Sequence, residues 1–304
     1  MNQREELSSR LGLDVPRGWW PNAPMLKAME AAGFAWVQVR TPPRAMLCDR
    51  ERLLRHASAL RRQLGTSGLK LVLHAPDDLS AGDPAHDRAL DGLLDYAAAT
   101  GARYVVYHAS PHGGHEEEDS LRARIPRIER LGVTLAIENL APVHPGPPKL
   151  SHDPSHVRDL VLRLGSPRIG MLFDAGHANI VAGLRGTYVE ALLEPVLDTV
   201  VLFHLHDNLG ARGDRGTAPG LDPLRLDLHL APGSGRLRWG AIASLLLQRA
   251  VPLVLEVHPP QRPEPLALAS VTSGLLLRDR PSVGGARPAM HDGRPRAGAA
   301  VPPG

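Results

Sequence analysis

The hydrophobic pattern of this chain alternates between short apolar runs and longer amphipathic segments as far as residue 277. Short apolar runs bounded by turn residues are typical of buried strands, whereas apolar positions three and four residues apart predict amphipathic helices. The predicted strands cover residues 11–15, 35–40, 69–74, 103–108, 132–138, 168–174, 199–206 and 251–257. The predicted helical segments include residues 23–33, 49–65, 83–101, 154–165, 239–250 and 264–277.

This alternation predicts an α/β fold in which eight strand and helix pairs close into a single parallel (β/α)8 barrel. Crossovers between parallel strands are right-handed, so the helices lie outside and the carboxyl ends of the strands open on one face. A doubly wound open sheet is the alternative, but it would spread the strand ends along a crevice. We predict one barrel domain over residues 1–277 and a tail over residues 278–304.

Six of the predicted strands end on a side chain of a type that binds metal ions. A strand that helices cover on both faces is apolar along its length, and a lone ionisable group at its end is costly to bury without a metal or partner. In a parallel barrel these ends converge on one mouth. The six residues are His74, His108, Glu138, Asp174, His204 and Glu256.

Three more residues of the same type follow the strand ends. His177 lies three residues after Asp174, and Asp227 and His229 form an Asp-x-His step after the seventh strand. Nine nitrogen and oxygen ligands without a thiolate are too many for one ion, and they could hold two or three Zn, Mn or Fe ions. The sequence therefore predicts a multinuclear metal site at the barrel mouth.

Charge and composition argue against DNA or a membrane as the partner. The formal charge is +3, but residues 278–304 alone carry five arginines and two aspartates, so the rest of the chain is formally neutral. DNA binding needs clustered Lys and Arg. No apolar run approaches the roughly 20 residues of a membrane span, and the polar N-terminus does not resemble a signal peptide. We expect a cytoplasmic protein with a disordered Pro-, Gly- and Arg-rich tail.

The motifs resemble those of the xylose isomerase-like TIM barrel superfamily, which unites sugar phosphate isomerases and epimerases with the endonuclease IV type of AP endonuclease (family 2). The resemblance covers about residues 10–277 and rests on LHAP, YHAS, IENL, FDAGHAN, HLHDN, DLHLAPGSG and LEV. It implies up to three ions, for which zinc is favoured and Mn, Fe or Co are alternatives. The implied ligand groups are His74, His108 and Glu138; Glu138, Asp174, His204 and Glu256; and His177, Asp227 and His229.

One position within HLHDN is ambiguous. His204 and His206 both fit the local pattern, and by strand alternation both face inward. We assign His204 as the ligand because its spacing to Asp207 resembles the family motif. This assignment leaves His206 to orient a ligand or to contact the substrate.

Other residues are candidates for supporting roles at the barrel mouth. Asn139 and Asp207 are expected to orient metal ligands. Arg40 could pair with a phosphate or carboxylate of the substrate, or with a carboxylate of the barrel rim. Trp19 and Trp20, after the first strand, could stack on a sugar or close the barrel end by packing.

Two kinds of reaction are compatible with these residues. In the isomerases and epimerases that the chain resembles, one ion polarises a carbonyl and a hydroxyl while two glutamates, here Glu138 and Glu256, exchange protons. In the endonuclease branch, three zinc ions hydrolyse a phosphodiester. We expect a metal-dependent isomerase or epimerase acting on a small polyhydroxylated or phosphorylated molecule. Hydrolysis of a small phosphoester is a close alternative, and a non-catalytic metal- or sugar-binding barrel is a third. The sequence leaves the oligomeric state open.

Overall fold

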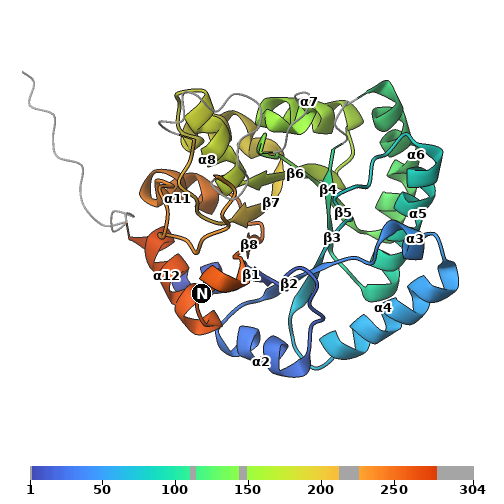
Figure 1. Cartoon of the computed structure of the whole chain (residues 1–304), viewed down its shortest axis with the longest axis horizontal. Helices are drawn as coiled ribbons and strands as arrows, with labels where there is room; N and C mark the ends of the chain where they lie inside the picture. The colour runs from blue at the N-terminus through green and yellow to red at the C-terminus, as the bar shows by residue number, and fades with distance from the viewer. Residues whose placement is uncertain (1, 110–113, 144–148, 212–225, 279–304) are drawn as a thin grey trace, which may run out of the picture.

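Eight parallel strands form a closed barrel, with β1 paired to both β2 and β8 (Figure 1). The structure is a computed structural model that describes residues 2–109, 114–143, 149–211 and 226–278. The predicted (β/α)8 fold is confirmed. The strands are β1 (Leu11–Asp14), β2 (Trp36–Arg40), β3 (Lys70–His74), β4 (Tyr104–His108), β5 (Thr134–Glu138), β6 (Ile169–Asp174), β7 (Val200–Leu205) and β8 (Leu253–Leu255).

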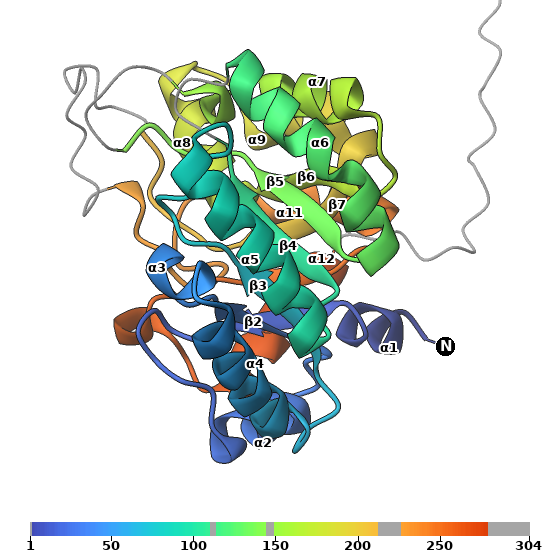
Figure 2. The same ribbon diagram turned by 90° about the vertical axis from the view of Figure 1, so that its right-hand side faces the viewer.

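The helices surround the barrel. They are α1 (Gln3–Ser8), α2 (Ala23–Ala31), α3 (Arg44–Leu47), α4 (Arg50–Leu64), α5 (Pro84–Thr100), α6 (His115–Leu131), α7 (Pro154–Leu164), α8 (Ala175–Leu184), α9 (Val189–Leu193), α11 (Trp239–Gln248) and α12 (Pro265–Leu277). Short 3-10 helices cover Leu150–His152, Glu194–Thr199 and Pro259–Gln261. Figure 2 shows α4, α5 and α6 side by side outside the strands. None of the described helices is both long and apolar enough to cross a membrane.

Local capping explains where several of these helices begin and end. Asp49, Asp83 and Asp153 each accept a backbone N–H at the start of α4, α5 and α7. An aspartate in this position contributes about 1 kcal/mol to helix stability. Gly101 and Gly165 end α5 and α7 in the left-handed conformation, which costs glycine no steric strain.

An apolar layer fills the barrel interior directly below the strand ends. It consists of Trp36, Val72, Val106, Ala136, Leu172, Leu202 and Val254. Because side chains alternate along a strand, the residue two positions further on also points inward, above this layer. These next residues are Gln38, His74, His108, Glu138, Asp174, His204 and Glu256. The apolar layer therefore forms the floor on which the candidate site rests.

Five of the described α-helices were not among the predicted segments: the short α1, α3 and α9, and the longer α6 and α8. In α8, eight of the ten residues are buried, so the segment has no polar face to reveal a helical period. The other longer helix, α6, begins in a run of charged residues and contains Pro126. The predicted tail lies outside the described residues apart from Arg278, so the domain boundary and the tail stay predictions.

Candidate metal centre

A cluster of four buried residues lies at the centre of the barrel mouth. His204 Nδ1 is 3.2 Å from Glu138 Oε1, 3.5 Å from Glu256 Oε2 and 3.7 Å from Asp174 Oδ2. One imidazole proton cannot neutralise three buried carboxylates, and Asp174 Oδ2 has no hydrogen-bond partner among the described residues. This donor set fits a divalent cation, which would compensate the buried charges.

A second group of donors shares Glu138 with the central cluster. His108 Nε2 lies 3.0 Å and His74 Nε2 3.6 Å from Glu138 Oε2. The other ring nitrogen of His74, Nδ1, donates to the carbonyl of Ala75 at 2.8 Å, and this hydrogen bond directs Nε2 towards the carboxylate. The three side chains could hold a cation next to the central one, bridged by Glu138.

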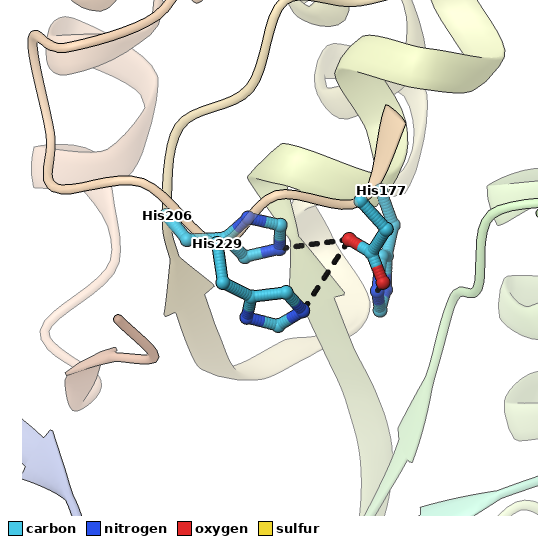
Figure 3. Close-up of side chains that lie close together, drawn as sticks. His177, His206 and His229 are labelled. Carbon is cyan, nitrogen blue, oxygen red and sulfur yellow. Dashed lines mark ion pairs between the residues drawn. The ribbon is translucent and has the colours of Figure 1, made fainter. Parts of the chain in front are cut away.

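A third group lies against the central cluster, with His177 Nδ1 3.5 Å from Glu138 Oε1 and His229 Nδ1 3.9 Å from Glu256 Oε2. Figure 3 shows the histidines of this group. His177 Nε2 is 3.6 Å from Asp227 Oδ2, and His229 Nε2 is 3.3 Å from Asp227 Oδ1. Nδ1 of His177 donates to the carbonyl of Asn139, and Nδ1 of His229 donates to the carbonyl of Glu256, each at 3.0 Å. Both imidazoles are thus fixed with Nε2 towards the shared carboxylate, as expected of metal ligands.

The structure separates the two histidines of HLHDN. His204 lies in the central cluster, where the sequence placed it. His206 lies in the third group, with Nε2 4.0 Å from Asp227 Oδ1, and both histidines are 0% exposed. All nine predicted ligands therefore come together at one mouth, and their roles as metal ligands stay predictions.

The carboxylates of this site raise the pKa values of His204 and His229, which therefore stay protonated at neutral pH when no cation is bound. Burial alone would lower the pKa of His204, but Glu256 and Glu138 outweigh burial and raise it to about 9. Burial is likewise outweighed at His229, whose pKa Asp227 raises to about 9. Burial would raise the pKa of Glu138, yet His204 and His108 hold it well below its ordinary value. A cation must therefore displace imidazole protons when it binds.

Asn139 holds the start of α8 in place. Its side-chain oxygen accepts from the backbone N–H of Asp174 at 2.8 Å, and its side-chain N–H donates to the carbonyl of Asp174 at 3.1 Å. The backbone carbonyl of Asn139 also accepts from His177. Asn139 is therefore placed to orient two of the candidate ligands.

Asp207 organises the loop that follows His229. Its carboxylate accepts from the backbone N–H groups of Gly233 and Leu237, each at 3.0 Å, and from Trp239 Nε1 at 2.9 Å. A Cβ at Gly235 would lie 2.2 Å from this carboxylate, so only glycine fits there. Asp207 thus fixes the backbone of the loop next to the candidate ligand His229. The turn APGSG, residues 231–235, binds this internal carboxylate.

A cavity of about 730 Å³ opens above the three groups. Arg40 lines it and pairs with Asp77 at 2.6 Å, which is the rim salt bridge anticipated for this arginine. Trp19 and Trp20 are not among the lining residues: Trp19 is 60% exposed, and Trp20 packs edge-on against His56 of α4. A substrate contact for either tryptophan stays a prediction that this arrangement does not favour.

Three polar residues of the site were missed in the sequence. Gln38 accepts from His204 Nε2 at 2.8 Å and donates to Glu256. Asp77 lies between Arg40 and the histidines at the ends of β3 and β4, His74 and His108. Asp14, the last residue of β1, lines the cavity and pairs with Arg262. Strand alternation could have identified Gln38, since it lies two residues after Trp36 and so faces inward.

The comparison with known families agrees with this geometry. Residues 26–273 match the sequence model of the family described as xylose isomerase-like TIM barrel. The chain belongs to this family. Among curated relatives, the uncharacterized protein y4fM of Sinorhizobium fredii is 28% identical over 170 residues, which are 52% of this chain and 47% of that protein. The chain thus spans about half the length of this curated relative.

Solved structures of similar fold cover most of this xylose isomerase-like chain. A D-tagatose 3-epimerase-like protein has a TM-score of 0.66 at 15% identity, covering 88% of this chain and 97% of that one. The TTHB071 protein from Thermus thermophilus, soaked with ZnCl2, has a TM-score of 0.60 at 24% identity, covering 90% and 100%. At these identities the likeness shows the fold alone.

We predict that zinc binding to the metal-free protein releases protons at pH 7.5. His204 and His229 have pKa values of about 9, so both are protonated at this pH and must lose their protons to bind zinc. Calorimetric titrations in two buffers of different ionisation enthalpy should give different binding heats, because the buffer takes up the released protons. Apparent affinity should fall as the pH is lowered. Equal heats in both buffers would contradict the prediction.

We also predict that Gln38→Leu lowers the affinity of the central cluster for zinc by about 10- to 100-fold, the usual effect of losing a partner of a metal ligand. The change removes the acceptor of His204 and the donor to Glu256. Competition with a chelating indicator measures the affinity. Gln63→Leu in α4 is the matched control and should bind as the wild type does. Unchanged affinity in Gln38→Leu would show that Gln38 does not orient these ligands.

Proposed function

We propose that this protein is a metal-dependent isomerase or epimerase of a small polyhydroxylated or phosphorylated substrate. One observation supports this reaction above others. Of the four residues of the central cluster, Glu138 and Glu256 line the cavity, whereas Asp174 and His204 do not and are 0% exposed. The two residues of the central cluster that face the cavity are therefore both carboxylates: Glu138 is the last residue of β5, and Glu256 directly follows β8.

This arrangement suits proton transfer at a carbon next to a carbonyl. A bound cation would polarise the substrate carbonyl and the neighbouring hydroxyl, which acidifies the hydrogen on the carbon between them. One glutamate takes that proton, and the other returns a proton to the substrate. Metal contact and burial tune the pKa values of such a carboxylate pair so that one acts as base and the other as acid. Gln38, hydrogen-bonded to Glu256, and His204 beneath the pair hold the carboxylates in position.

The lining of the cavity supports a small, highly polar substrate. Besides the candidate ligands it carries five charged residues, Arg17, Arg40, Lys149, Asp14 and Asp77, together with aliphatic residues such as Leu140 and Val143. No Trp, Tyr or Phe is among the lining residues in the described ranges. Recognition would therefore rest on hydrogen bonds and charge more than on stacking, which suits hydroxyl and phosphate groups. The similar fold of a D-tagatose 3-epimerase-like protein supports the same substrate class.

A phosphoester hydrolase is the second candidate, and the first and third groups of donors favour it. Proton transfer between two glutamates needs one cation, whereas His74, His108, Asp227 and His229 provide donors for more. Several cations together can bind a phosphate, activate water and stabilise the leaving oxygen. The two candidates differ in whether a carbon-bound hydrogen of the substrate exchanges with solvent.

The isomerase proposal predicts exchange of solvent deuterium into a ketose or ketose phosphate. Glu138→Gln and Glu256→Gln should each lower the exchange rate by about 10²- to 10⁴-fold, because each removes one acid or base. NMR of a substrate panel in D2O measures exchange, and metal analysis shows whether each variant keeps its ions. Glu264→Gln, on an exposed residue before α12, is the matched control. Full exchange in both cavity variants would exclude the proposed roles.

The hydrolase candidate predicts release of phosphate or an alcohol from small phosphoesters without any such exchange. His108→Ala and Asp227→Asn should then lower the rate of release, because each removes a donor of the first or third group. A colorimetric phosphate assay with a panel of monoesters and diesters measures this. Hydrolysis unaffected by both changes would show that neither group takes part.

A further inference from the structure

His206 is a buried histidine whose ring nitrogens form no hydrogen bond with the described residues. The side chain is 0% exposed, and neither ring nitrogen has a hydrogen-bond partner among the described residues. Buried polar groups are nearly always hydrogen-bonded, and leaving one unpaired costs free energy. The resemblance to the family offers three ligands for the third ion and gives His206 no place among them. A buried ring nitrogen without a hydrogen bond is available to bind a metal ion.

The surroundings of His206 are those of a metal ligand. Its imidazole is stacked on that of His229, with ring centroids 3.8 Å apart and an angle of 7° between the rings. Nε2 of both rings faces the same oxygen, Asp227 Oδ1, at 4.0 Å for His206 and 3.3 Å for His229. Figure 3 shows these two rings side by side and His177 facing them from across the carboxylate. One donor atom from each of the four residues lies within 4.8 Å of the others.

The chain also provides the space that the His206 ring occupies. A Cβ on Gly176, in the first turn of α8, would lie 2.1 Å from Cε1 of His206, so any larger residue would collide with the ring. The carbonyl of Gly176 accepts a hydrogen bond from Asn208 at 2.8 Å, and Asn208 in turn accepts one from Asn179 at 2.8 Å. These contacts fix the start of α8 against the segment that carries His206.

A different role for His206 would be to orient Asp174. Nε2 of His206 lies 3.1 Å from Asp174 Oδ1, where the two can form an ion pair, although the geometry is not that of a hydrogen bond. Asp174 Oδ1 already accepts the backbone N–H of His177 at 2.7 Å. The position of Asp174 is therefore set without His206, and this role leaves the missing hydrogen bond of Nε2 unexplained.

We propose that His206 is the fourth protein ligand of a zinc site formed with His177, Asp227 and His229. Three imidazole nitrogens and one carboxylate oxygen satisfy the tetrahedral preference of zinc. A site with four protein ligands has no open position for water or substrate, as in structural zinc sites. The third ion then braces the ends of β6 and β7 and the loop of Asp227, and substrate binds at the other two groups. This inference rests on the metal dependence proposed above.

Zinc content of the full-length chain tests the proposal. Each purified variant is loaded with zinc, passed through metal-free buffer and analysed by mass spectrometry. His206→Ala should retain one equivalent of zinc fewer than the wild type. Gly176→Ala should lose the same equivalent, because its methyl group displaces the ring while all four side chains remain. His258→Ala is the matched control: His258 also stacks on His229, at 4.5 Å, but is exposed and outside the group.

Cobalt substitution and crystallography make the test independent of variant stability. His206→Ala should lose the intense visible absorption of tetrahedral Co(II), whereas His258→Ala should keep it. This result would support His206 as the fourth ligand. In crystals of the zinc-loaded wild type, His206 Nε2 should lie about 2.0–2.1 Å from the third ion. Full zinc content in His206→Ala, or a crystal in which His206 bonds only Asp174, would overturn the proposal. Deuterium exchange tests the catalytic role of the glutamates separately, so the proposed function and the proposed zinc site can fail independently.

Discussion

The burial of carboxylates at the mouth of the barrel is the constraint on which the site depends. Glu138, Asp174 and Glu256 are 1%, 0% and 7% exposed, and they surround a single imidazole nitrogen. Below them lies an apolar layer that excludes water, so solvent cannot stabilise their charge from that side. Isolated charges in such surroundings are very costly, and only protonated imidazoles or cations can compensate them. The histidines of the three groups can compensate the charge when they are protonated, and they provide donor nitrogens for cations.

The three groups are coupled through shared atoms and through the backbone. Glu138 contributes one oxygen to the first group and the other to the central cluster. His177 and His229 donate to backbone carbonyls of Asn139 and Glu256, so orienting the third group depends on the same strand ends that form the central cluster. A change in one group should therefore disturb its neighbours, and effects of paired substitutions should not be additive.

The polar residues around these groups divide the mouth into a fixed part and an adjustable part. Asn139 binds the backbone of the last residue of β6, Asn208 binds the first turn of α8, and Asp207 binds the loop before α11; all three are nearly fully buried. Arg17 and Lys149 line the cavity, where they can meet a substrate. Fold and ligand positions are thus set by buried hydrogen bonds, whereas substrate choice is left to rim residues. This division is common in barrels of this type, whose loops vary while the scaffold stays constant.

The sequence determined the barrel and the ring of candidate ligands because both follow from local periodicity. Continuous apolar runs identify parallel strands, and a polar residue such as His74 or Glu138 at the end of each run must lie at the same face of a closed barrel. Predicted and observed strands agree within two residues at most ends. Periodicity also identified most of the long amphipathic helices, with α6 the exception, whereas α8 was missed because a helix buried on all sides has no periodic polar face.

Only the tertiary structure decided how the ring is divided and which residues support it. His204 lies within β7 beside Glu138 of β5, whereas His206 directly follows β7 and meets Asp227 and His229 from the segment before α11. Closure of the barrel also sets Gln38 of β2 against His204 of β7 and against Glu256, which directly follows β8. Alternation along a strand specifies which way a side chain points, but the contacts it makes depend on the rotation and register of strands far away in sequence. Those are fixed only when the barrel closes.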